Sequence, residues 1–140
     1  MTRQTPRLHL QVALPHSVNG LYFVPRCARC GHRGPGLQKS FEARAYTHTW
    51  GRHIEQCAQE VGFSIPKGHP IAIRGTVYLA DKRRDMPNTE KHLVDTIAQA
   101  CGFDDRYVAE LHLVAAYDAQ NPRVELVVEE LAQWPTPLPQ

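Results

Sequence analysis

Long apolar runs and a secretory leader are both missing from this sequence. No stretch reaches the roughly 18 consecutive apolar residues that a membrane-spanning helix requires. The first few residues are polar and contain no apolar signal-peptide core. The hydrophobic fraction of 42% and the charged fraction of 21% are ordinary for a water-soluble domain. We therefore expect a cytoplasmic protein whose 140 residues form one domain around one core.

Several motifs of familiar enzyme chemistries are also missing. There is no Gly-x-Gly-x-x-Gly string, no phosphate-binding loop and no Gly-x-Ser-x-Gly string. The eight histidines are scattered, without a His-x-His or His-Glu-x-x-His string. Nucleotide hydrolysis, serine-hydrolase chemistry and a histidine-based nuclease therefore have no support. The net charge of +2 does not by itself indicate a nucleic-acid partner, so the placement of the charges matters more than their sum.

Cysteine is scarce as well, with four in the chain. Without a secretory signal, structural disulfides are not expected, and a metal site or simple thiols remain. Cys27 and Cys30 have the spacing at which two thiolates bind one tetrahedral Zn²⁺. His53 and Cys57, at i and i+4 on one helix face, would supply the other two ligands. Two other histidines could replace the first of these: His32 and His48.

The alternative to a zinc site is that these cysteines are ordinary thiols. Cys57 and Cys101 would then be small buried residues, and the Cys-x-x-Cys pair would be exposed. If zinc is bound, its role is to fold a glycine- and proline-rich loop and to present three basic side chains to DNA. These are Arg26, Arg29 and Arg33.

Apolar periodicity predicts a small α+β fold. Residues 7–14 and 71–80 alternate at period two and are expected to form strands. Residues 41–61, and a segment that starts near Pro87 and ends near Ala100, are expected to be helices. Two further strands, 107–117 and 123–131, are expected to pair as a hairpin through the loop 118–122.

The predicted order is therefore β-α-β-α-β-β, a small mixed sheet packed with two helices. We assign residues 1–131 to a single domain, in which 27–57 form the candidate zinc-stabilised loop and helix, and 132–140 to an extended proline-rich tail. For the first helix, one apolar stripe fits the spacing best: Ala45, Thr49, Trp50, His53, Ile54, Cys57, Ala58 and Val61. The second helix is expected to bury Leu93, Val94, Ile97, Ala98 and Cys101.

The stretch from Lys82 to Lys91 carries the functional argument. Asp85 follows three consecutive cations, Lys82, Arg83 and Arg84. It lies at the junction between the expected strand 71–80 and the second expected helix. A second acidic pair, Asp104-Asp105, follows that helix. Carboxylates beside cations suit a divalent metal held against a phosphate backbone, and the strand–turn–helix–turn–strand order is expected to bring them together. The alternative is structural: Asp85 caps the helix and Lys91 pairs with Asp95.

These residues resemble the RusA-type Holliday-junction resolvases. The likeness runs from about Leu8 to Glu130 and includes the turn Pro15-His16-Ser17-Val18-Asn19. Its most specific part is Arg83-Arg84-Asp85-Met86-Pro87-Asn88, followed by Lys91 and by Gly102-Phe103-Asp104-Asp105. The resemblance implies a homodimeric, bacterial or phage-encoded, Mg²⁺-dependent endonuclease that makes paired nicks in four-way DNA junctions during recombination and repair.

The resemblance also implies roles for individual residues. Asp85 and Asp105 match metal-binding carboxylates, Lys91 matches a catalytic lysine, and Asn88 matches the asparagine that closes the first motif. DNA contacts are expected from Lys82, Arg83, Arg84 and Asn88, and from Arg29 and Arg33 of the cysteine loop. Magnesium accepts few protein ligands when phosphate oxygens and waters supply the others.

Two departures from the family pattern matter. Pro87 stands where the pattern has a second aspartate, so Glu90 and Asp104 are the candidates for a third metal ligand. The Cys-x-x-Cys loop replaces a shorter basic hairpin. Two other functions therefore remain: a junction-binding protein of the same fold that has lost cleavage, and a zinc-stabilised interaction module that does not bind DNA.

Overall fold

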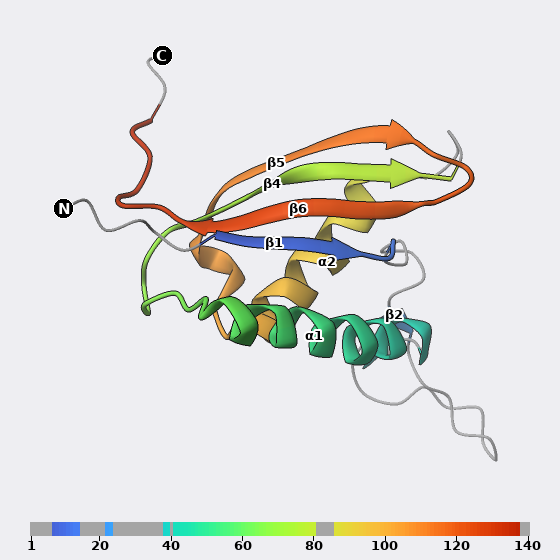
Figure 1. The fold of residues 1–140 in the computed structure, drawn as a ribbon, viewed down its shortest axis with the longest axis horizontal. Helices are drawn as coiled ribbons and strands as arrows, with labels where there is room; N and C mark the ends of the chain where they lie inside the picture. The colour runs from blue at the N-terminus through green and yellow to red at the C-terminus, as the bar shows by residue number, and fades with distance from the viewer. Residues whose placement is uncertain (1–6, 15–21, 24–37, 40, 81–85, 138–140) are drawn as a thin grey trace.

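The computed structural model describes residues 7–14, 22–23, 38–39, 41–80 and 86–137 (Figure 1). Its long elements follow the predicted order β-α-β-α-β-β. They are β1 (Arg7–Val12), α1 (Phe41–Val61), β4 (Ile71–Leu79), α2 (Met86–Cys101), β5 (Val108–Tyr117) and β6 (Arg123–Glu130). A short 3₁₀ turn, η2 (Asp105–Tyr107), precedes β5, and two short strands, β2 (Tyr22–Phe23) and β3 (Gln38–Lys39), pair with each other. The predicted α+β class, with a mixed sheet and two helices, is confirmed.

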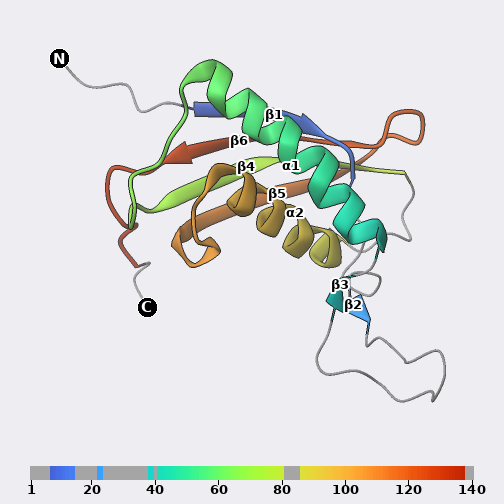
Figure 2. The ribbon, with the colours of Figure 1, turned by 90° about the horizontal axis from the view of Figure 1, so that it is seen from below.

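The four long strands form one sheet in the order β1-β6-β4-β5. β6 is antiparallel to both of its neighbours, whereas β4 and β5 are parallel and are joined by α2 as a crossover. Both helices lie on the same face of the sheet, α1 toward β1 and α2 toward β5 (Figure 2). The sheet therefore has one covered face, one open face and two edges, β1 and β5.

The core lies between the helices and the covered face. Alternate residues of β1 and β6 are buried, as period-two alternation predicts. In β4 the burial extends to Ala72 on the other face, as expected for a strand with neighbours on both sides. The core residues from the strands are Leu8, Leu10, Val12, Ile71, Ile73, Val77, Leu79, Val124, Leu126 and Val128. The helices add Ile54, Ala58, Leu93 and Ile97.

The predicted hairpin between the last two strands is wrong. β6 does not pair with β5; it crosses the end of β4 and lies between β4 and β1. Asp118, the first residue after β5, donates its backbone N–H to the carbonyl of Leu79 at the end of β4 (2.9 Å). The connection itself is a loop, as the turn residues predict, but it leads β6 past the end of β4 to the other side of that strand.

The buried face of α1 is also rotated from the predicted stripe. Ile54 and Ala58 are buried as expected, but Ala45, Thr49, His53 and Val61 are exposed. The first turns are anchored instead by Ala43 and Tyr46. The Tyr46 hydroxyl donates to the carbonyl of Ala13 (2.7 Å), and its ring packs against His92 of α2. The helix is thus oriented by contacts to β1 and α2 that its own sequence does not encode.

The stripe of α2 is largely as predicted. Leu93, Ile97 and Ala98 are buried, and Val94 and Cys101 are partly buried against the core. Two polar residues, His92 and Thr96, are buried with them. Within the described ranges, neither helix is long and apolar enough to cross a membrane.

Candidate functional site

The way in which α2 ends determines the position of the acidic turn that follows it. Gly102 adopts a left-handed conformation (φ 75°), and its N–H and that of Phe103 both donate to the carbonyl of Ala98 (2.9 and 3.0 Å). This closure of the helix directs the next two residues, Asp104 and Asp105, into the start of η2. Both carboxylates are exposed there. The acidic pair thus follows α2 without an intervening loop.

The two aspartates of this turn have different roles. Asp104 caps η2: its Oδ1 accepts the backbone N–H of Arg106 (3.1 Å), and its Oδ2 pairs with the Arg106 guanidinium (3.1 Å). The Arg106 N–H, followed by the Arg106 charge, holds the pKa of Asp104 below its usual value. Because both oxygens of Asp104 are already used by the turn, Asp105 is the better placed of the two to bind a cation.

The surroundings of the acidic turn are basic and aromatic. A cavity of about 310 Å³ lies between this turn and the 65–69 turn, and Lys67, His69 and Arg106 line it. His69 Nδ1 lies 2.6 Å from a carboxylate oxygen of Glu130. The Arg106 guanidinium lies 5.1 Å from the Tyr107 ring centroid, and the Trp134 ring is tilted against Tyr107 at a centroid distance of 6.4 Å. Basic side chains therefore lie beside the acidic turn.

The other half of the predicted site is at the start of α2. Lys91 is exposed and Glu90 is half-buried, both within the first two turns of the helix. Asp85, Lys82, Arg83 and Arg84 lie outside the described residues, and so does the side chain of Asn88. Their predicted roles stay predictions.

The helix α2 separates Met86 from the acidic turn. It has 16 residues, so about 24 Å separate its first residue from its last. Asp105 follows the end of this helix. Asp85 lies outside the described residues, so its expected approach to Asp105 stays a prediction.

No group of three metal-binding side chains comes together among the residues that the structure describes. Magnesium holds its ligands at about 2.1 Å, so two carboxylates that share it must be within a few ångströms of each other. One chain's described residues therefore do not form a complete magnesium site.

The candidate zinc ligands on α1 are arranged as predicted relative to each other. The Sγ of Cys57 lies 3.7 Å from Nε2 of His53, one helical turn away. Cys27, Cys30, Arg29 and Arg33 are outside the described residues. Zinc binding stays a prediction. Cys101, in contrast, is partly buried against the core, and this burial raises its pKa to about 11.

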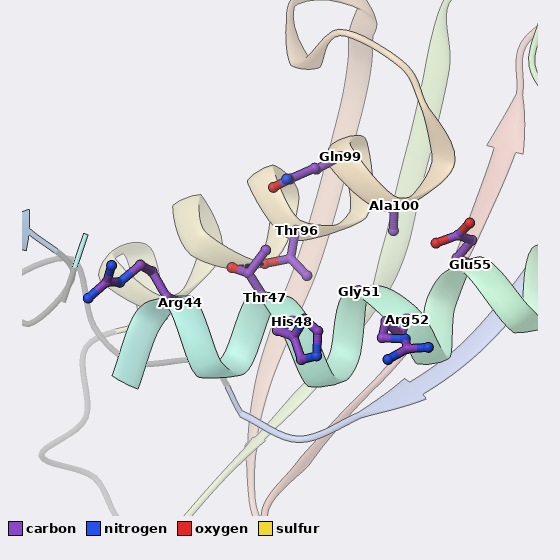
Figure 3. Close-up of a pocket in the computed structure, with 9 residues that line it drawn as sticks. All are labelled: Arg44, Thr47, His48, Gly51, Arg52, Glu55, Thr96, Gln99 and Ala100. Atoms are coloured by element: carbon purple, nitrogen blue, oxygen red, sulfur yellow. Dashed lines mark hydrogen bonds between the residues drawn. The ribbon is translucent and has the colours of Figure 1, made fainter. Parts of the chain in front are cut away.

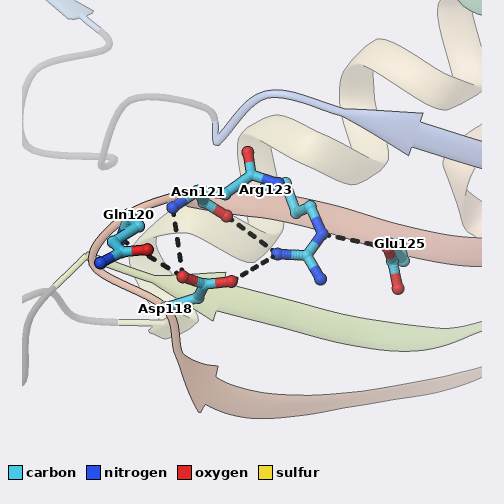
Figure 4. Close-up of polar contacts among 5 residues, drawn as sticks. All are labelled: Asp118, Gln120, Asn121, Arg123 and Glu125. Carbon is cyan, nitrogen blue, oxygen red and sulfur yellow. Dashed lines mark hydrogen bonds and ion pairs between the residues drawn. The ribbon is translucent and has the colours of Figure 1, made fainter.

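A polar network at the end of β4 was missed by sequence reasoning. Arg123 donates to Asp118 (2.9 Å) and to Glu125 (3.0 Å) (Figure 4). Its guanidinium also lies 3.9 Å from the centroid of the Tyr78 ring. Asp118 also accepts the backbone N–H groups of Gln120 and Asn121. This network fixes the end of β4, from which the chain continues toward the Arg-Arg-Asp string.

A groove between the two helices was also missed. It has a volume of about 460 Å³, and residues of α1 and α2 line it (Figure 3). Arg44, His48 and Arg52 are exposed along α1 at intervals of four residues, which aligns them on one face. That spacing is visible in the sequence, where His48 was considered only as an alternative zinc ligand. A basic stripe of this kind can contact a phosphate backbone.

Comparisons with known proteins do not identify a family. No family model and no curated protein matches the chain. Among solved structures, IspF of Plasmodium falciparum in a CDP complex aligns over 90% of this chain and 92% of its own, at 7% identity and a TM-score of 0.35. That similarity is too low to support an argument about function.

Proposed function

We propose that this protein is a Mg²⁺-dependent endonuclease that cuts four-way DNA junctions in recombination and repair. The observation that carries the proposal is the position of α2 relative to the motif. The helix begins at Met86, directly after the Arg-Arg-Asp string, and ends at Cys101, just before Asp104-Asp105. The resolvase-like residues therefore bracket one helix in a fold with the expected order of elements.

Each motif residue has a role in this proposal. Asp85 and Asp105 would hold the metal, and Lys82, Arg83 and Arg84 would grip neighbouring phosphates. Lys91 would stabilise the charge that develops on the scissile phosphate. When bound, Mg²⁺ supplies Lewis-acid polarisation of the phosphate and lowers the pKa of a water. A symmetric pair of chains would place two such sites on the two-fold related strands of a junction.

A second candidate function is junction binding without cleavage. Two observations favour it: Pro87 cannot bind a metal, and Asp104 is already engaged by Arg106. If cleavage is retained, Glu90 on α2 is the candidate for the missing metal ligand. The two functions share the DNA contacts and differ only in hydrolysis.

A labelled four-way junction distinguishes the two functions. Incubation with and without Mg²⁺, run on denaturing and native gels in parallel, reports cleavage and binding separately. The endonuclease proposal predicts symmetric nicks that require Mg²⁺. A mobility shift without nicks would support the binding protein, and the absence of both would support an interaction module that does not bind DNA.

Asp105→Asn tests the acidic turn. We expect nicking to fall by about 100-fold or more, the loss typical of removing one preorganised electrostatic contact, with junction binding retained. Glu60→Gln is the matched control, since Glu60 is an exposed carboxylate on α1, and should nick at the wild-type rate. Loss of binding by Asp105→Asn would show a structural role instead.

The zinc proposal is independent of the nuclease proposal. Metal analysis of protein purified without chelator should find close to one zinc per chain if Cys27, Cys30, His53 and Cys57 form a site. Less than about 0.2 zinc per chain would contradict it, because structural sites bind tightly. Substitution of Cys30 by serine should remove the metal, and substitution of Cys101 should not.

A further inference from the structure

The arginines that the structure describes fall into two groups. Those outside the groove between α1 and α2 all form ion pairs with carboxylates: Arg7, Arg74, Arg106 and Arg123. Arg44 and Arg52, which line the groove, are exposed and take part in none of the ion pairs between described residues (Figure 3). The arginine charge that no described carboxylate offsets therefore lies in this groove.

The spacing of these two arginines suits a single anion. They are about 12 Å apart along α1, or roughly two helical turns. His48 lies midway between them on the same side of the helix and also lines the groove. Because both arginine side chains are exposed, each can turn toward an anion beside His48. A phosphate group accepts charge-assisted hydrogen bonds from guanidinium groups in this way.

Hydrogen bonds between the two helices hold the groove in shape. The Thr47 hydroxyl of α1 lies 3.2 Å from Nε2 of His92 and 3.5 Å from the hydroxyl of Thr96, both on α2. The Thr96 hydroxyl donates to the carbonyl of His92 (2.9 Å), and both α2 residues are buried. The two walls are therefore held at a fixed spacing, as in a binding site that is formed before its ligand arrives.

Gly51 leaves the backbone of α1 open in the middle of the groove. A glycine inside a helix costs about 1 kcal/mol relative to alanine. A Cβ added at Gly51 would meet no described atom within 4 Å, so packing within the described chain does not require glycine there. Glycine also allows a ligand to approach the backbone closely. Its position among the lining residues therefore indicates a ligand rather than a packing constraint.

One carboxylate among the lining residues limits the size of that ligand. Figure 3 shows Glu55 and Arg44 at opposite ends of the groove. A long polyanion that lies along the groove would meet Glu55, whereas a single phosphate between the two arginines would not. Gln99 of α2 offers an amide to the rest of the molecule. The volume of about 460 Å³ is in the range of small-molecule sites.

We propose that the groove between α1 and α2 binds a phosphate monoester, held between Arg44 and Arg52, on a ligand of nucleotide size. Such a group is present on a free mononucleotide and at the phosphorylated 5′ end of a nucleic-acid strand. None of the groove residues belongs to the resolvase-like motif, so the inference does not depend on the proposed nuclease function.

Calorimetric titration distinguishes the two sources of the phosphate. The probes are deoxyadenosine 5′-monophosphate and a short single strand with and without a 5′-phosphate. A chelator is present throughout, so that metal-dependent binding at the acidic turn does not contribute. We expect saturable binding of the mononucleotide, one per chain. Binding of the phosphorylated strand alone would also support the site and would identify a strand end as its ligand. An unphosphorylated strand that binds as tightly as the phosphorylated one, or no binding of any probe, would overturn the proposal.

Substitution of the two arginines locates the site. Arg44→Gln and Arg52→Gln should each weaken binding of the phosphorylated probe by about 10-fold, because each removes a charge-assisted contact. Arg7→Gln and Lys67→Gln are the matched controls, since they remove the same charge from exposed positions outside the groove, and should bind as the wild type does. Equal weakening by Arg7→Gln would show a non-specific effect of charge, and equal weakening by Lys67→Gln would place the phosphate beside the acidic turn. Either result would overturn the proposal.

Gly51→Leu tests the shape of the groove separately from its charge. Leucine favours helix over glycine, so the melting temperature should not fall. Its side chain would occupy the space beside the backbone, and binding of the phosphorylated probe should be lost. A folded Gly51→Leu variant that binds as tightly as the wild type would overturn the proposal. If this variant does not fold, the arginine variants decide the question.

Discussion

The two edges of the sheet differ in length, composition and pairing. β1 has six residues and alternates strictly between buried apolar and exposed polar side chains. Its outward residues are Arg7, His9 and Gln11, and Arg7 forms an ion pair with Glu129 on the neighbouring strand (3.1 Å). β5 has ten residues, and Leu111 and Val114 expose apolar surface on its two faces.

This difference indicates which edge is protected against pairing. Short edges with charged and polar outward residues resist the addition of another strand, whereas long apolar edges favour it. β1 has the first set of properties. β5 is longer and exposes Leu111 and Val114, but it also contains Glu110, which binds Arg74 of β4 (2.6 Å). Arg74 also binds Glu129 of β6 (3.0 Å), so charged side chains link these three strands.

The largest expected effect is on the free energy of unfolding, when a leucine is shortened in one edge strand or the other. Leu10→Ala, in the buried face of β1, should lower the free energy of unfolding by about 3 kcal/mol. Leu111→Ala, on the partly exposed β5, should cost no more than about 1 kcal/mol within the chain. Denaturant midpoints of the wild type and both variants distinguish them. The midpoint of Leu10→Ala should be lowered by the larger amount. Equal behaviour of the two variants would remove the distinction between the edges.

A smaller effect on stability is expected at the contact between the two central strands, β4 and β6. A Cβ at Gly75 of β4 would overlap the backbone carbonyl of Glu125 and the Cβ of Leu126, both on β6. Gly75→Ala should therefore destabilise the fold by about 2 kcal/mol. The control is Gly51→Ala in α1, where no atom lies within 4 Å of the added Cβ. That substitution should instead stabilise the fold by up to about 1 kcal/mol, because alanine favours helix. Thermal unfolding of both variants checks the opposite signs.

The smallest effect concerns the connection between β5 and β6. The Arg123 side chain, followed by the backbone N–H of Asn121, holds the pKa of Asp118 below its ordinary value of 3.8. A lowered folded-state pKa means that the stabilisation is present above pH 3.8 and is lost as the pH falls through the folded value. The wild type should therefore be more stable than Asp118→Asn at neutral pH, and the difference should shrink in acid. Melting temperatures across this range provide the measurement, and a constant difference would contradict it.

Much of the fold was predictable because it depends on local periodicity. The period-two pattern of β1 and β4 and the bounds of α1 are as the sequence predicts. The β5–β6 hairpin was not predictable from turn residues, because the turn does not reveal that β4 lies between the two strands.

The candidate site was predicted as a set of residues but not as a geometry. The motif gave Lys91 and Asp105, of which Lys91 lies in α2 and Asp105 follows it. The sequence does not show that Arg106 engages Asp104 through its backbone N–H and its side chain. Those contacts depend on the conformation of the turn after α2.

The central claim is that the acidic turn after α2 belongs to a Mg²⁺-dependent nuclease site, and the junction-nicking rates of Asp105→Asn and Glu60→Gln test it most directly. Both variants are assayed with Mg²⁺ on the same labelled four-way junction. The account predicts that Glu60→Gln nicks at the wild-type rate, and that Asp105→Asn binds the junction but nicks about 100-fold more slowly. An Asp105→Asn variant that nicks at the wild-type rate would contradict the account.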